Sequence, residues 1–328
     1  MADIPVGILG LGAMVPERRL TNQDLEQMVD TSDEWIVTRT GIRERRIAAP
    51  DEATSDLALV AARLAMERAE VRPQDIDLII VATVLPDMLF PSTACLVQER
   101  LGAVRAAAFD LEAACSGFIY ALSVGSQFIA TGMYRHVLVI GAEVLSRIVN
   151  WQDRNTCVLL GDGAGAAVLG PSRGERTLLS TYLGADGAGA DLLKQPAGGS
   201  RLPATVQTLA DGMHYVHMNG NQIFRFAVRT MGAATFAGLK KAGLTMDDLD
   251  FLVPHQANLR IIEAAAERFG LGMEKVMINI DRYGNMSAAS IPVALEEAES
   301  TGRLQKGDHV VMVAFGGGLT WGSAVVRW

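Results

Sequence analysis

The sequence predicts an α/β fold built from two similar halves. Two pairs of segments match at one spacing: residues 68–81 resemble 241–254, and residues 136–140 resemble 309–313, each 173 positions further on. Both halves also alternate continuous apolar runs with helical patterns, which is typical of largely parallel strands covered by helices on both faces. We therefore expect two duplicated α/β halves with mostly parallel sheets, packed around a pseudo-twofold axis.

The predicted elements follow the same order in both halves. Each predicted strand is a continuous apolar run, and each predicted helix carries apolar residues at helical spacing. We expect strands at residues 77–82, 106–111, 136–141, 250–253, 277–280 and 309–314. We expect helices at residues 55–69, 117–131, 222–241, 259–269 and 288–300.

A turn-rich stretch from Gly170 to Gly174 marks the predicted boundary between the halves. It divides the chain into residues 1–172 and residues 173–328, without a flexible linker between them. Two similar halves usually pack against each other, and a site at their junction can then take residues from both. Two separate domains without a shared site are the alternative.

The composition is that of an ordinary globular protein. Hydrophobic residues make up 49% and charged residues 20% of the 328 residues. The net charge of −8 argues against general nucleic-acid binding, which needs a basic surface. Three cysteines are too few for a disulfide framework and indicate a reducing, cytoplasmic compartment. The acidic start Met1-Ala2-Asp3 is unlike a secretory leader, and no apolar run approaches the ~20 residues that span a bilayer.

Two glycine-rich segments resemble ligand-binding loops but fit other structures better. Gly10 to Val15 resembles a dinucleotide fingerprint, yet Pro16 follows where the required helix would have to begin. Gly161 to Gly165 has strand-like residues on both sides, which predicts a tight turn between strands rather than a phosphate loop. Since no cluster of Cys and His has the spacing of metal ligands, we expect no metal site.

Cys115 is the candidate nucleophile. It follows the predicted strand 106–111 and precedes the predicted helix 117–131, so the free N–H groups and the dipole of a helix N-terminus favour its thiolate. Its neighbours are small, which leaves room for a substrate. The alternative is a small buried cysteine that only packs. We adopt that alternative for Cys95, on an amphipathic helical pattern, and for Cys157, inside an apolar strand-like run.

His255 is the candidate partner from the second half. It follows the predicted strand 250–253, at the carboxyl end of the strand, where sites in α/β proteins collect. Asn258 is suited to cap the helix that comes next. His136 and His309 precede strands in equivalent turns and are expected to be structural.

Asn285 is the third candidate. It follows the predicted strand 277–280 in the loop that corresponds to the Cys115 loop, three residues short of the 173-residue spacing. A twofold junction would bring Asn285 close to Cys115. Without the duplication, an asparagine that follows a glycine is more often a turn residue.

Five motifs together resemble the 3-oxoacyl-[acyl-carrier-protein] synthase III family. They are Thr31 to Arg43, Ala114-Cys115-Ser116-Gly117-Phe118, Pro254-His255-Gln256-Ala257-Asn258, Gly284-Asn285 with Ser287-Ala288-Ala289-Ser290, and Phe315-Gly316-Gly317-Gly318 with Thr320-Trp321-Gly322. The resemblance runs from about residue 8 to the last residue. It implies a thiolase-like fold, a homodimer and the initiation of type II fatty-acid synthesis. It implies no cofactor, because acyl-CoA and malonyl-[acyl carrier protein] are substrates.

The resemblance also implies the catalytic roles. Cys115 would attack the acyl-CoA thioester, and the backbone N–H groups of Cys115 and Gly317 would form the oxyanion hole. His255 and Asn285 would donate hydrogen bonds to the thioester oxygen of malonyl-[acyl carrier protein]. They would thereby stabilise the enolate that remains when carbon dioxide leaves. That carbanion would attack the acyl group on Cys115.

The binding roles follow from the same resemblance. Trp35 and Arg154 would stack on the adenine of CoA, Arg39 would lie near its phosphate, and Asn258 would contact the pantetheine arm. The alternative for the charged residues is an ordinary solvated surface. Phe90 would reach into the partner subunit's acyl pocket.

Three arginines are the candidates for docking the carrier protein. They are Arg225, Arg260 and Arg268. Glu263 and Glu267 interrupt the basic pattern of this region, and Met286 follows Asn285 where the family often has threonine. These departures put the docking surface and the support of the Asn285 loop in question.

Three other enzyme classes compete with this interpretation. A degradative thiolase has a second cysteine close to its C-terminal glycine run, whereas here no cysteine follows Cys157. A starter condensing enzyme of quinolone or polyketide type could keep all three catalytic residues. A Cys-His-Asn thioester hydrolase would use the same side chains, but it would discharge its acyl-enzyme with water and gives no reason for a duplicated core.

Overall fold

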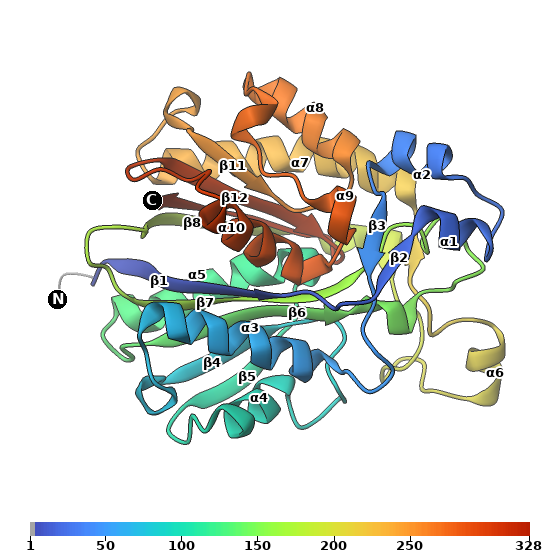
Figure 1. The fold of residues 1–328 in the computed structure, drawn as a ribbon, viewed down its shortest axis with the longest axis horizontal. Coiled ribbons are helices and arrows are strands. Elements are labelled where there is room, and N and C mark those ends of the chain that lie inside the picture. Colours follow the sequence, from blue (N-terminus) through green and yellow to red (C-terminus); the bar gives the residue numbers. More distant parts are fainter. Residues whose placement is uncertain (1–3) are drawn as a thin grey trace.

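The computed structural model describes residues 4–328, so the acidic start Met1-Ala2-Asp3 lies outside the described residues. Nine strands form its large sheet (Figure 1). They are β1 (Val6–Met14), β4 (Leu78–Ala82), β5 (Ala107–Leu111), β6 (Val137–Val144), β7 (Asp162–Pro171), β8 (Thr177–Ala185), β11 (Phe251–Pro254), β12 (His309–Gly316) and β13 (Thr320–Arg327). The larger helices are α3 (Thr54–Ala69), α4 (Thr93–Leu101), α5 (Gly117–Ala130), α7 (Gly220–Lys241), α8 (Leu259–Phe269) and α10 (Ser290–Ser300).

The sheet consists of two half-sheets that meet at a single residue pair. Its strand order is β11-β12-β13-β8-β1-β7-β6-β4-β5, and β8 is joined to β1 only between Thr177 and Gly7. In each half-sheet a single strand, β7 or β13, runs against all the others. β4 pairs in parallel with β5 and β6, and β11 pairs in parallel with β12. The predicted α/β class with mostly parallel strands is confirmed.

The helices form three layers around the two half-sheets. Figure 1 shows α5 and α10 between the half-sheets, with α3 and α4 outside the N-terminal one and α7 and α8 outside the C-terminal one. The central core joins Phe118 and Leu122 of α5 with Ile291 and Leu295 of α10 and with strand residues from both half-sheets. Two outer cores lie under the outer helices. Both faces of each half-sheet are therefore covered, which explains the continuous apolar runs.

The duplication is visible in the register of the strands. Leu78 of β4 pairs with Val137 of β6, and Phe251 of β11 pairs with Val310 of β12. The members of the second pair follow those of the first by 173 residues. The five predicted helices agree with the structure within two residues at each end, and five of the six predicted strands are present.

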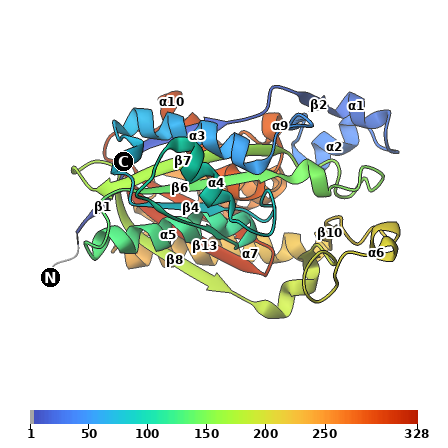
Figure 2. The same cartoon turned by 90° about the horizontal axis from the view of Figure 1, so that it is seen from below.

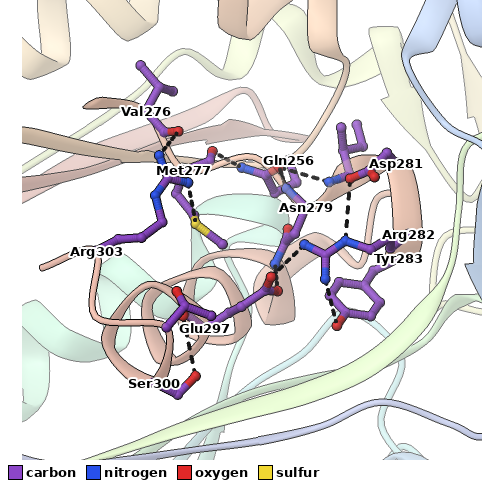
Figure 3. A network of polar contacts seen from close by, with 12 residues as sticks. Gln256, Val276, Met277, Asn279, Asp281, Arg282, Tyr283, Glu297, Ser300 and Arg303 are labelled. Atoms are coloured by element: carbon purple, nitrogen blue, oxygen red, sulfur yellow. Dashed lines mark hydrogen bonds and ion pairs between the residues drawn. The ribbon is translucent and has the colours of Figure 1, made fainter. Parts of the chain in front are cut away.

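The strand predicted at 277–280 is wrong. Val276 makes an isolated bridge with Leu252 of β11, and Ile280 already begins the short helix α9 (Ile280–Tyr283). The side chain of Gln256 takes the place of a neighbouring strand, because its oxygen accepts the N–H groups of Asn279 and Ile280. Figure 3 shows this network beside the loop that follows β11. Residues 277–280 are mostly apolar because they lie inside the protein, not because they form a strand.

The strand predicted around Cys157 and the turn predicted at Gly161 to Gly165 are also wrong. Cys157 lies in a turn, although it is fully buried as expected. β7 begins at Asp162, so Gly163 and Gly165 belong to the strand rather than to a turn.

Smaller elements gather at one end of the sheet (Figures 1 and 2). They are β2 (Arg19–Thr21), β3 (Glu44–Arg46), α1 (Asn22–Glu26), α2 (Asp33–Thr40), α6 (Val206–Ala210), β9 (Leu193–Lys194) and β10 (His217–Met218). Within residues 4–328, no helix has the length and apolar character needed to cross a membrane.

Candidate active site

A cavity of about 350 Å³ lies where the two halves meet. Its apolar wall includes Val84, Leu145, Ile148, Leu160, Val216 and Met218, and its polar wall includes Cys115, Asn285, Ser287, Gly317 and Thr320. Cys115 comes from the first half and Asn285 from the second, so the structure places the two on one pocket as the duplication argument expects. An apolar chamber with a few polar groups at one place is suited to an acyl chain that ends in a reactive thioester.

Cys115 lies in the 3-10 turn Ala114–Ser116, directly before α5. The turn is unusual, because Ala114 has a φ of +45° and its N–H donates to the carboxylate of Glu112 over 2.9 Å. The glycine run after β12 packs against this turn. A Cβ atom at Gly316 would lie 2.7 Å from the Cys115 nitrogen, so a residue with a side chain there would displace the nucleophile.

The Cys115 thiol keeps its proton in the resting protein. Its side chain opens on the cavity, yet protein atoms surround the sulfur closely, and this burial raises the pKa of the thiol to about 12. Glu143 and Glu112 raise the pKa further through their charges, whereas a hydrogen bond with the Ser287 side chain lowers it. The expectation that the helix N-terminus makes Cys115 a thiolate is therefore wrong here, because burial outweighs it.

His255 follows β11 directly, and its imidazole is neutral. Its backbone N–H donates to the carbonyl of Val313 over 2.8 Å, and its ring meets the Phe315 ring edge-on at a centroid distance of 5.7 Å. Only 1% of the residue is exposed, and Nδ1 has no partner among residues 4–328. Burial lowers the pKa of His255 to about 3.

His255 is not part of the cavity wall, unlike Cys115 and Asn285. The end of β12 lies between His255 and Cys115. Phe315 contacts the His255 ring, and the next residue, Gly316, packs against Cys115.

Asn285 is held in one orientation. Its backbone N–H donates to the carbonyl of Leu159 over 2.8 Å, and its carbonyl accepts the N–H of Gly161 over 3.0 Å. The side-chain oxygen accepts the N–H of Ser287 over 2.9 Å. The amide nitrogen Nδ2 is then the group that can donate to a substrate.

Met286 does not weaken this loop. The side chain is fully buried and packs with Ala289 and Val293, and the Met286 N–H donates to the Ser290 hydroxyl over 3.1 Å. Methionine at this position therefore supports the loop through the core instead of through a hydroxyl group.

Two residues near the nucleophile were missed in the sequence. Ser287 lies on the cavity wall with Cys115, and Glu143 is a fully buried carboxyl group that accepts from the Thr83 hydroxyl and the Val84 N–H. The signals were present: Glu143 is an acid inside the apolar strand β6, and Ser287 follows Ala114 by 173 residues. Ser287 repeats the φ of +45° found at Ala114.

The residues expected to bind CoA form one cluster. The guanidinium of Arg39 lies 4.6 Å from the ring centre of Trp35, and that of Arg154 lies 5.0 Å from it. Arg154 also donates to the carbonyl of Asp30 over 2.9 Å, and the side chain of Asn258 donates to the carbonyl of Arg39 over 2.9 Å. Asn258 caps α8 as expected. Two cations therefore lie close to the ring on which an aromatic ligand would stack.

The arginines expected to dock the carrier protein share the α7–α8 face but lie apart from the cavity wall. Arg225 on α7 and Arg260 and Arg268 on α8 are exposed. Exposed Glu263 and Glu267 lie on the same helix, so the face carries charges of both signs.

Two exposed residues need an explanation outside the cavity. Phe90 is 84% exposed and does not line the pocket of its own chain. Cys95 is also exposed, with the Ser92 hydroxyl 3.1 Å from its sulfur, so the expectation that it is buried is wrong. Within residues 4–328, no group of three or more His, Cys, Asp or Glu residues could hold a metal ion.

Two family models match the chain. The one described as 3-Oxoacyl-[acyl-carrier-protein (ACP)] synthase III matches residues 109–187, and the one described as 3-Oxoacyl-[acyl-carrier-protein (ACP)] synthase III C terminal matches residues 239–328. A relative from Symbiobacterium thermophilum, named Beta-ketoacyl-[acyl-carrier-protein] synthase III, is 65% identical over 324 residues. These residues are 99% of this chain and 98% of the relative.

Solved structures with the same fold are similar along the whole chain. The 3-oxoacyl-[acyl-carrier-protein] synthase III from Aquifex aeolicus is 48% identical with a TM-score of 0.92, covering 98% of this chain and 100% of that chain. A priming beta-ketosynthase from a polyketide biosynthetic pathway is 37% identical with a TM-score of 0.92, covering 99% of this chain and 97% of that chain.

Proposed function

The chain belongs to the 3-oxoacyl-[acyl-carrier-protein] synthase III family, and we propose that Cys115, His255 and Asn285 perform its condensation reaction. The protein is an acyltransferase that joins an acyl-CoA primer to malonyl-[acyl carrier protein] and so initiates type II fatty-acid synthesis. The reaction needs no cofactor beyond these two thioesters. The observation that supports the three residues most directly is that one pocket joins Cys115 of the first half with Asn285 of the second.

The first step transfers the primer to Cys115. Because the thiol is protonated, its proton must leave as the sulfur attacks the thioester. The new bond joins the Cys115 sulfur to the acyl carbon, and the bond between that carbon and the CoA sulfur breaks. The departing thiolate takes up one proton and leaves as CoA. The N–H groups of Cys115 and Gly317 would hold the oxyanion of the intermediate.

The second step forms the carbon–carbon bond. The amide nitrogen of Asn285 and a ring N–H of His255 would donate to the thioester oxygen of the malonyl group, where negative charge grows as carbon dioxide leaves. A neutral imidazole can fill this role, because one of its two ring nitrogens carries a hydrogen and can donate it. The enolate carbon attacks the acyl carbon on Cys115, the carbon–sulfur bond breaks, and the thiolate takes up one proton. The product is a 3-oxoacyl-[acyl carrier protein].

The test separates the two steps by intact-protein mass. We expect an acyl adduct on Cys115 after mixing with acetyl-, isobutyryl- or octanoyl-CoA, and its discharge into a 3-oxoacyl product when malonyl-[acyl carrier protein] is added. Cys115→Ala should form no adduct. His255→Ala and Asn285→Ala should both retain acylation and lose most of the decarboxylation. An equal adduct in wild type and in Cys115→Ala would refute the assignment of the nucleophile.

The substrate-binding roles are proposed on the same grounds. Trp35, Arg39 and Arg154 would receive the adenine and phosphate groups of CoA, and Asn258 would hold the pantetheine arm; their clustering supports this. The carrier protein would dock on α7 and α8 through arginines of that face. They are Arg225, Arg260 and Arg268.

We propose a homodimer in which Phe90 enters the partner subunit's acyl pocket. Two features support a second copy at this place. Leu89 and Phe90 are 85% and 84% exposed in one chain, and among residues 4–328 β5 ends the strand order with an open edge. Analytical ultracentrifugation of wild type and of Phe90→Asp would test the assembly, since the charge should disfavour the dimer. We also propose the division into halves 1–172 and 173–328, and a cytoplasmic location, which the three free cysteines support.

The competing functions are not favoured. The relative with 65% identity is named Beta-ketoacyl-[acyl-carrier-protein] synthase III, whereas the polyketide priming enzyme is 37% identical. Hydrolysis would predict an adduct that water removes before malonyl-[acyl carrier protein] arrives, which the mass experiment would show.

A further inference from the structure

A buried glutamine beside the site uses its whole hydrogen-bonding capacity on the backbone. None of the surface of Gln256 is exposed. Its side-chain nitrogen donates to the carbonyl of Pro254 over 2.9 Å and to that of Met277 over 3.1 Å. Its side-chain oxygen accepts the N–H of Asn279 over 3.0 Å and that of Ile280 over 3.1 Å. Both hydrogens and both lone pairs of the amide are therefore satisfied, so the side chain is fixed in one orientation.

This amide joins the two segments that carry the proposed donors to malonyl-[acyl carrier protein]. His255 lies in the 254–258 segment and Asn285 in the 277–285 segment. The N–H of Met277 still donates to the carbonyl of Leu252 on β11 over 2.8 Å, and the pairing with β11 ends there. Among residues 4–328, every hydrogen bond between the two segments comes from the Gln256 side chain (Figure 3).

The short helix α9 transmits the position of Asn279 to Asn285. The carbonyl of Asn279 accepts the N–H of Arg282 over 3.1 Å. Glu297 on α10 accepts from the Asn279 side chain over 3.1 Å and also from the Arg282 guanidinium, so α9 is held at both ends. A displacement of Asn279 would therefore move the turn that presents the Asn285 amide.

We propose that Gln256 is a positioning residue that sets the separation between His255 and Asn285. The proposal rests on the proposed function, in which both side chains donate to one thioester oxygen. Two donors reach one oxygen only when both lie about 2.7–3.2 Å from it, and a misplacement of about 1 Å can cost on the order of 100-fold in rate. Gln256 itself does not line the cavity and acts through the two donors.

The nucleophile has separate supports. The N–H of Ala114 donates to the carboxylate of Glu112 over 2.9 Å, and the Thr320 hydroxyl donates to the carbonyl of Ala113 over 2.9 Å. These bonds hold the turn that carries Cys115 without the Gln256 amide. Loss of the amide should therefore slow decarboxylation and spare acylation.

Gln256→Met is the test, because methionine is similar in length and forms none of the four hydrogen bonds. Acylation is followed by intact-protein mass, with the acyl-CoA that gives the largest adduct. Decarboxylation is followed as carbon dioxide released from malonyl-[acyl carrier protein]. We expect decarboxylation to fall on the order of tenfold or more, and acylation to stay within about twofold of wild type.

Gln98→Met is the matched control. Gln98 is half-buried on α4, and its side chain donates to the carbonyl of Ala103 over 2.7 Å. It contacts neither of the two segments through a hydrogen bond. Both rates should stay within about twofold of wild type in this variant.

A double substitution shows whether Gln256 acts through the separation of the donors. In the Asn285→Ala background only one donor remains, so adding Gln256→Met should lower decarboxylation by less than about threefold. A loss as large as that in the wild-type background would overturn the proposal, because the glutamine would then act by another route.

The single variant can also overturn the proposal, either by unchanged decarboxylation or by an equal fall in both rates. If Gln256→Met does not fold, Gln256→Glu decides. It keeps the shape and the accepting oxygen but loses the donors to Pro254 and Met277, so the same division between the two rates is expected and the same two results would overturn it. Wild-type decarboxylation in both His255→Ala and Asn285→Ala would instead refute the proposed function, and no Gln256 variant is needed to see it.

Discussion

Replacing Arg45 with methionine should destabilise the fold and slow decarboxylation more than acylation. Arg45 lies on β3 with none of its surface exposed. Its guanidinium donates to the carbonyl of Leu20 and the side-chain oxygen of Asn22 over 3.0 Å, and to the carbonyl of Val158 over 2.8 Å. The next residues after Val158 hold the backbone of Asn285. The arginine thus supports the loop that presents the Asn285 amide.

Two opposing free energies set the size of the effect on stability. Burial lowers the pKa of Arg45 from 12.5 to about 10, so keeping the charge buried costs the folded protein about 3 kcal/mol at neutral pH. Methionine would remove this cost. It would also leave three buried oxygen acceptors without their donor, at about 1–3 kcal/mol each. The second term is larger, and we expect a net loss of about 2–4 kcal/mol in the free energy of unfolding.

Urea unfolding measures the first effect, and single-turnover rates of acylation and of malonyl decarboxylation measure the second. Arg43→Met is the control, because Arg43 lies two residues away and is exposed. It should leave the unfolding free energy within about 0.5 kcal/mol of wild type. An Arg45→Met variant as stable as wild type, or one in which both rates fall equally, would refute the reasoning.

Three further perturbations have defined outcomes. Gly316→Ala places a Cβ 2.7 Å from the Cys115 nitrogen, so CoA release on acylation should slow on the order of 100-fold in a folded protein; wild-type rates would contradict this. Trp35→Ala should raise KM for acyl-CoA on the order of tenfold and spare kcat, whereas a fall in kcat alone would argue against adenine stacking. The pKa of His255 is lowered from 6.5 to about 3, so its stabilising contribution is complete above about pH 6.5 and falls by about 1.4 kcal/mol per pH unit toward pH 3. When the free energy of unfolding in urea is measured at a series of pH values, His255→Asn should make it fall less steeply between about pH 6.5 and about pH 3. An unchanged slope would contradict this.

The sequence was sufficient for the elements that carry continuous apolar runs. β4, β6, β11 and β12 are covered by helices on both faces, so their apolar character follows directly from their position. It was not sufficient for β1, in which glycines interrupt the run. A Cβ at Gly12 would lie 2.2 Å from the carbonyl oxygen of Ala61 on α3, so the glycines are required for close packing of helix on strand. The close packing of β1 against α3 therefore explains the glycines from Gly10 onward that resembled a dinucleotide-binding loop.

Burial without strand structure caused the other errors. Residues 276–280 and 157–160 are apolar because they lie inside the protein, but the first run is held by the side chain of Gln256 and the second by the backbone of Asn285. Local periodicity does not reveal such long-range contacts. The state of Cys115 was mispredicted for the same reason. A helix N-terminus can be read from the sequence, whereas the atoms that surround the sulfur cannot.

The duplication explains why the nucleophile and its neighbours come from different halves. A twofold arrangement brings equivalent points of the two halves together near the axis, and α5 and α10 both lie between the two half-sheets and contribute to one core (Figure 1). Ala114 and Ser287 are equivalent and share a φ of +45°. The residue after Ala114 is Cys115, and Ser287 of the other half lies on the same cavity wall as this cysteine. Asn285 lies two residues before Ser287, and its bridge with Leu160 holds it on the wall of the same cavity. The repeated turn therefore presents Cys115 to the cavity in the first half, and Asn285 and Ser287 in the second half, because the residues in and around the turn differ between the halves.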